Sequence, residues 1–143
     1  MLEKQLQTKF TRWCKSMNGI KWISDRGGCM AFELKMVKLK SLAFSSVPEH
    51  QEQALMKARG LTGVPLVHKI SDSALGYLPF DCFTLYGAGA YLVIGYLRFD
   101  GLTVVAIKIE DWITEKYGYD GVLKRGSLSF ERALELGGVL VGV

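Results

Sequence analysis

The segment FELKMVK, residues 32–38, alternates apolar and charged side chains from Phe32 to Met36, as a β-strand does. Side chains two residues apart emerge on the same face of a strand, so Glu33 and Lys35 share one face and Phe32, Leu34 and Met36 share the other. An isolated pair of this kind is most simply a surface ion pair on a half-exposed sheet. The pair therefore has to be weighed together with the residues that the rest of the chain brings beside it.

The composition indicates one globular domain spanning residues 1–143. Of the 143 residues, 49% are hydrophobic and 22% are charged, which suits a single substantial core. Apolar stretches such as 90–95 and 102–107 are far shorter than a membrane span, and residues 1–10 are too polar for a signal peptide. We therefore expect a soluble, cytoplasmic protein with no membrane partner.

The three cysteines and the net charge narrow the function classes only slightly. Cys14, Cys29 and Cys82 lie in apolar segments and form no CxxC or Cys/His cluster, so we expect reduced core residues rather than zinc ligands or disulfides. The formal net charge of +4 is compatible with a polyanionic partner without requiring one.

The order of helical and extended patterns predicts an α/β (α+β) domain with a central mixed β-sheet flanked by helices. Apolar residues at steps of three and four predict a helix over 2–17, whose other face is basic. Ser46 and Glu49 form a capping box that predicts a helix from there to about Arg59, before Gly60. The other predicted elements are a basic loop over 38–46, strands over 20–24, 29–38, 65–70, 80–86, 90–99 and 102–109, and helices over 110–117 and 129–137. Ser129 is the expected N-cap of the last helix, and Gly137 is its expected end.

One polar residue lies on the apolar face of the predicted helix that follows the charged strand. Gln51 shares that face with Ala54, Leu55 and Ala58. Because a polar group on a core face needs a hydrogen-bonding partner, Gln51 is a candidate site residue.

A strand carboxylate with the neighbouring backbone carbonyl of Leu34 offers hard oxygen ligands for Mg²⁺, and a lysine on the same face can orient an attacking water. Such a site needs a second carboxylate. Asp25 lies upstream, across the presumed hairpin of 20–24 and 29–38, and Asp81 lies in the later apolar strand. An acid within an apolar strand is costly unless it is paired or metal-bound, whereas one in a turn needs no explanation, so the residues favour Asp81.

The strand acid and lysine, the polar residue on the next helix and the later aspartate together resemble the active site of the PD-(D/E)XK nuclease superfamily. Within that superfamily, the chain resembles the Holliday junction resolvases of the RecU and archaeal Hjc type, most closely the small resolvase-like proteins often carried by phages. The resemblance rests on FELK (32–35), SLAFSSVPEHQEQAL (41–55), HKISDSALGYLPFDCF (68–83), AYLVIGY (90–96) and SLSFERA (127–133). It implies a restriction-endonuclease-like core and a Mg²⁺- or Mn²⁺-dependent endonuclease that resolves four-way DNA junctions during recombination and repair. It also implies a homodimer in the cytoplasm, or in the host cytoplasm if a phage encodes it.

Carried over to this chain, the resemblance assigns roles to individual residues. Glu33, Asp81 and the backbone carbonyl of Leu34 would hold the metal, Lys35 would be the catalytic lysine, and Gln51 would support the site. Further supporting residues would be Glu3, Asp25, Lys69 and Asp72. The DNA-binding residues would be Lys38, Lys40, Lys57 and Lys69.

The chain departs from the superfamily's usual order, in which the acid precedes the ExK motif on the adjoining hairpin strand. If Asp81 is the ligand, the strand over 80–86 must lie beside the strand that carries Glu33. Two alternatives to a junction resolvase stay open at this point. A related nuclease could act on other branched, nicked or foreign DNA, and a catalytically idle DNA-binding or inhibitor module could keep the same fold.

Overall fold

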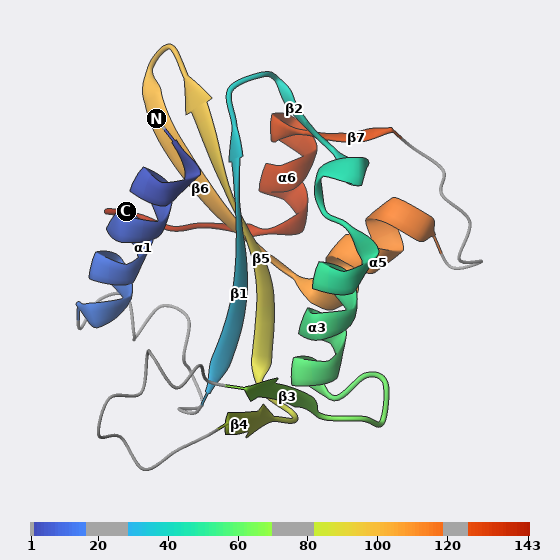
Figure 1. Ribbon diagram of the computed structural model, residues 1–143. Helices are drawn as coiled ribbons and strands as arrows, with labels where there is room; N and C mark the ends of the chain where they lie inside the picture. The colour runs from blue at the N-terminus through green and yellow to red at the C-terminus, as the bar shows by residue number, and fades with distance from the viewer. Residues whose placement is uncertain (1, 17–28, 70–81, 119–125) are drawn as a thin grey trace.

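The computed structural model describes residues 2–16, 29–69, 82–118 and 126–143 (Figure 1). The predicted order of helices and strands is largely confirmed in these ranges. The elements are α1 (Glu3–Lys15), β1 (Met30–Val37), β2 (Ser41–Ala43), the 3₁₀ helix η1 (Phe44–Ser46), α3 (Glu49–Arg59), β3 (Leu66–Lys69), β4 (Cys82–Leu85), β5 (Gly89–Arg98), β6 (Gly101–Lys108), α5 (Ile109–Tyr117), β7 (Ser127–Ser129), α6 (Phe130–Leu136) and β8 (Gly138–Val139).

The main sheet is mixed and has the strand order β1-β5-β6-β8. Strand β1 runs parallel to β5 from the pair Met30 and Gly89 to the pair Val37 and Tyr96. Strand β5 is antiparallel to β6, and β6 is antiparallel to β8. β5 is nearly all apolar because helices cover both of its faces. The predicted mixed sheet flanked by helices is confirmed.

Helix α1 covers one face of the sheet, and α3, α5 and α6 cover the other (Figure 1). Leu6, Phe10 and Trp13 of α1 pack against the even-numbered apolar residues of β1. On the opposite face, Leu55 of α3 and Trp112 of α5 share a buried cluster with residues of β5 and β6. The main sheet therefore has a hydrophobic layer on each side.

Two short antiparallel ribbons lie outside the main sheet. Strand β2 pairs with β7, and β3 pairs with β4 near the end of the sheet where β5 begins (Figure 1). The prediction of a loop over 38–46 is therefore wrong in part, because this segment contains β2 and η1. Leu42 and Phe44 are buried there, so the segment contributes to the core despite its lysines and serines.

A site with Asp81 requires the predicted strand over 80–86 to lie beside the charged strand, and the part of it that the structure describes does not lie there. That part, β4, pairs with β3, and the neighbour of β1 is β5. Cys82 and Phe83 are exposed, so β4 is not the buried strand that its composition predicted. Cys29 is exposed as well, and Cys14 is half-buried; all three cysteines are free thiols, but Cys29 and Cys82 are not core residues.

The predicted helix ends at Gly60, Ser129 and Gly137 are correct, and the one at Ser46 is wrong. Gly60 ends α3 with a φ of 87°, a left-handed conformation that glycine adopts without strain. Ser129 accepts a hydrogen bond from the backbone N–H of Arg132 and caps α6. The capping box is wrong, because Pro48 is the N-cap of α3 and Ser46 belongs to η1.

Gly137 lies where α6 passes closest to β6, and we expect that the change Gly137→Ala destabilises the fold. An added Cβ would lie 2.5 Å from the carbonyl oxygen of Ala106 and 2.9 Å from side-chain carbons of Val105 and Ile107. Overpacking of this kind costs about 1–3 kcal/mol of the free energy of unfolding, which urea denaturation would measure. At Gly126 a Cβ would meet nothing within 4 Å, so Gly126→Ala is the matched control. Equal losses in the two variants would contradict this explanation.

Candidate functional site

Glu33 and Lys35 face the α3 side of the sheet. Ala31 and Val37, the odd-numbered residues before and after them, pack in the buried cluster that contains Leu55 of α3. Because successive side chains of a strand alternate between faces, Glu33 and Lys35 lie on that same side. The pair is therefore placed between the sheet and the helix that follows it in the chain.

The two charged groups form an ion pair. Lys35 Nζ lies 3.2 Å from Glu33 Oε1, and the side chains are 13% and 26% exposed, respectively. A pair with so little exposure has lost much of its hydration, so the protein has to compensate the charges by direct contact. The predicted proximity of this carboxylate and this amine is therefore confirmed. The pair lies in a layer that is only partly open to solvent.

Gln51 contributes an unsatisfied polar atom to the same layer. It lies in the first turn of α3, which packs against β1 and β5. Its side-chain oxygen Oε1 is buried and has no hydrogen-bonding partner among the described residues. Leaving a buried acceptor unpaired costs about 1–3 kcal/mol, so the position calls for a hydrogen-bond donor, such as a bound water.

The oxygen atoms on this side of the sheet suit a hard cation. The Glu33 carboxylate and the unpaired Gln51 amide oxygen are oxygen atoms of the type that Mg²⁺ and Mn²⁺, or the waters these ions carry, prefer. No group of three or more His, Cys, Asp or Glu side chains gathers in those ranges. Asp25 and Asp81, the two predicted sources of a second carboxylate, lie outside the described residues.

The structure separates some of the other predicted residues from this pair. Glu3 is exposed at the start of α1, which covers the opposite face of the sheet. Lys38 and Lys40 are exposed in the turn after β1, and Lys57 is half-buried on α3. Lys69 ends β3, and Asp72 lies outside the described residues.

A buried carboxylate next to Gln51 was not predicted. Glu52 is 2% exposed; its Oε1 accepts hydrogen bonds from Lys116 Nζ at 2.6 Å and from Trp112 Nε1 at 3.1 Å, and its Oε2 accepts one from the Tyr117 hydroxyl at 2.8 Å. The buried stripe of α3 contains Glu52, Leu55 and Ala58, so the helix is rotated from the predicted face. The spacing of Trp112 and Lys116 on one helical face was the only sequence signal for this network.

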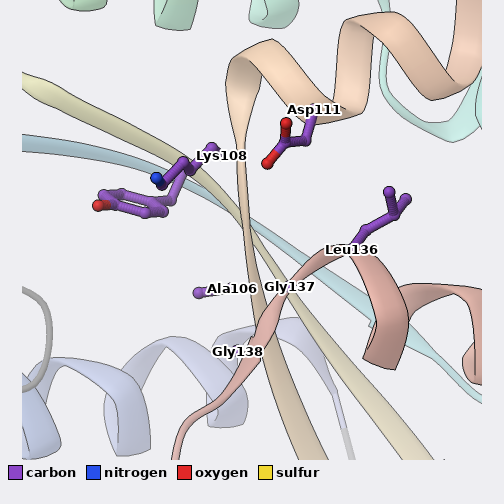
Figure 2. A pocket seen from close by; sticks show the side chains of 7 residues that line it. Ala106, Lys108, Asp111, Leu136, Gly137 and Gly138 are labelled. Atoms are coloured by element: carbon purple, nitrogen blue, oxygen red, sulfur yellow. The ribbon is translucent and has the colours of Figure 1, made fainter.

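A cleft of about 290 Å³ lies where β6 meets α5, α6 and β8, and neither Glu33, Lys35 nor Gln51 lines it. Figure 2 shows Lys108 and Asp111 projecting from the junction of β6 and α5, with Leu136, Gly137 and Gly138 opposite them. Ala106 and Tyr91 complete the lining, and both belong to the α1 side of the sheet. The cleft and the Glu33–Lys35 pair are therefore separate features.

Comparisons of the chain with protein-family models, with curated proteins and with solved structures found no match. Within the described residues, no helix is both long and apolar enough to cross a bilayer. The functional argument consequently starts from the residues and their geometry.

Proposed function

We propose that this chain is a metal-dependent endonuclease that hydrolyses phosphodiester bonds of four-way DNA junctions. The observation that carries the proposal is the Glu33–Lys35 pair in the same layer as the unpaired Gln51 oxygen. The resemblance to junction resolvases supports the substrate class, and the net charge of +4 suits a polyanion.

Each side chain has a separate task in the proposed mechanism. Glu33, the carbonyl of Leu34 and a second aspartate would hold the cation, which when bound polarises the phosphate and makes a water more acidic. Lys35 would place its ammonium against the phosphate oxygen on which negative charge develops during attack. Gln51 Oε1 would accept a hydrogen bond from the attacking water and orient it, which would satisfy the unpaired oxygen.

Cleavage of a synthetic four-way junction, compared with linear duplex of the same arms, tests the proposal. With Mg²⁺ we expect paired cuts near the branch and slower or no cutting of the duplex. Equal rates on both substrates would favour a nuclease of other specificity. A protein that binds the junction but cuts it with neither Mg²⁺ nor Mn²⁺ would be an idle DNA-binding module, and the proposal would fall.

The second carboxylate can be identified by exchanging each aspartate. Strand β4, which follows Asp81 in the chain, is exposed and pairs with β3 rather than β1, so neither burial nor strand pairing supports Asp81, and the resemblance alone still assigns it to the metal. We therefore expect that Asp81→Asn abolishes junction cleavage and weakens Mn²⁺ binding in calorimetry, while Asp25→Asn changes neither. The reverse result would give the role to Asp25.

A further inference from the structure

Two hydrophobic side chains project from adjacent turns at one end of the sheet. Phe99, in the β5–β6 turn, is 98% exposed and Leu39, in the β1–β2 turn, is 80% exposed. No other large hydrophobic side chain in the described residues is as exposed. The last pair of the β1 and β5 ladder is Val37 with Tyr96, so the two turns start from neighbouring strands, at the top of Figure 1. We call this pair the tip.

The turns themselves do not require these residues. Gly101, with a φ of 126°, provides the left-handed conformation of the β5–β6 turn, so the position of Phe99 could hold any polar residue. Single exposed hydrophobic residues are ordinary, but two at the ends of adjacent strands form a protrusion that contributes nothing to the core. The tip is therefore a candidate contact surface.

The charges around the tip favour a polyanionic partner. Lys38 and Lys40 flank Leu39 and are exposed. Arg98 lies 4.2 Å above the ring of Phe130 and within 3.8 Å of Asp100 and 4.0 Å of Glu131, which anchors the base of the β5–β6 turn. The two acidic side chains are 63% and 75% exposed and share the single cation Arg98, so the two lysines, which form no ion pair within the described residues, give the tip its net positive charge.

We infer that the tip is a wedge that inserts between bases at the branch point of DNA whose backbone lies along Lys38 and Lys40. This inference rests on the proposed function and adds a means of substrate selection. Phenylalanine and leucine are side chains that proteins insert between base steps, and unstacking costs least where stacking is already interrupted. Lys35 and Leu39 are four residues apart, and because the chain bends after Val37 their separation is less than the roughly 13 Å of a fully extended segment, so one branch could meet both.

An anionic lipid surface is the competing partner, because it also accepts apolar side chains flanked by lysines. Lipid binding scales with the buried apolar area, and two side chains offer little of it. A planar aromatic ring, by contrast, can stack on a single base with useful energy. The observations therefore favour DNA over a membrane.

Binding of a four-way junction with 2-aminopurine at the branch tests the wedge without cleavage, using Ca²⁺ in place of Mg²⁺. Wild-type protein should raise the 2-aminopurine fluorescence as the base unstacks. Phe99→Ala should weaken junction binding roughly tenfold, the size expected for one lost aromatic stack, and should lose the fluorescence rise. Affinity for linear duplex should not change, and Phe99→Trp should retain junction binding. Leu39→Ala should have a smaller effect in the same direction.

Tyr86 is the matched control, because it is an aromatic residue with 61% exposure near the opposite end of the sheet. The wedge is overturned if Phe99→Ala binds the junction as wild type does, or if Tyr86→Ala weakens it equally. It is also overturned if Phe99→Ala reduces only the binding of phosphatidylserine vesicles. A protein that cuts junctions but is indifferent to Phe99 would lose the wedge and keep the proposed function. A wild type that binds no DNA would lose both.

Discussion

Replacing Lys35 with methionine is expected to reduce Mg²⁺-dependent junction cleavage roughly 10²–10³-fold, as loss of a single group that stabilises transition-state charge does. Methionine keeps the length and the apolar stem of the side chain, so the layer between β1 and α3 stays filled. Junction binding in Ca²⁺ should persist, because Lys35 is 13% exposed and would act on one phosphate only. Single-turnover cleavage and fluorescence anisotropy would measure the two quantities.

Lys108→Met is the control for the lost charge. Lys108 is exposed on the same sheet and pairs with Tyr91 on the α1 side, away from Glu33. The variant Lys108→Met should cut the junction at a rate within about twofold of wild type, since surface substitutions away from the site and the core have small effects. If both variants cut equally well, Lys35 has no catalytic role and its contact with Glu33 is structural.

Replacing Glu52 with alanine is expected to lower the free energy of unfolding by about 3–5 kcal/mol, because it leaves a buried cation without its partner. Lys116 is 6% exposed and would keep the carbonyl oxygen of Val47, at 3.1 Å, but would have no carboxylate beside it. Trp112 and Tyr117 would lose their acceptor as well. Urea denaturation followed by tryptophan fluorescence would measure the change.

A second ion pair between the same two helices provides the control. Arg59 Nε lies 2.6 Å from Glu110 Oε1, but these side chains are 43% and 34% exposed. Exposed pairs contribute about 0–1 kcal/mol, so Glu110→Ala should cost far less than Glu52→Ala. If the two variants lost similar amounts of the free energy of unfolding, burial would not explain the contribution of the Glu52 network to stability.

The same network makes stability depend on alkaline pH. Burial lowers the pKa of Lys116, but the hydrogen bonds to Glu52 and Tyr117 outweigh it, and the pKa is raised from its ordinary 10.5. Burial and the hydrogen bond to Glu52 also raise the pKa of Tyr117 from 10.0. Groups that hold their protons more tightly when folded stabilise the fold below their unfolded pKa and lose that contribution above it. The contribution is therefore present at neutral pH and is lost as the pH rises through the folded values.

Local patterns in the sequence account for the elements that were predicted correctly. The alternation in β1 and the three- and four-residue steps of α1 each report which face is buried, and these are properties of neighbouring residues. Gly60 and Ser129 mark helix ends because their own conformation or side chain meets the need of the adjacent turn. The same alternation placed Glu33 and Lys35 together.

Partners that are distant in the chain were decided only by the tertiary structure. The strand beside β1 is β5 rather than β4, the described part of the predicted strand over 80–86, because helices on both sides of β5 bury its apolar residues while β4 stays exposed. Glu52 and Lys116 are 64 residues apart, so no local pattern pairs them. The sequence by itself thus determined the charged strand and the helix that carries Gln51. Packing decided that the Gln51 oxygen is buried without a partner and that its neighbour Glu52 joins α3 to α5, because burial depends on which surfaces meet.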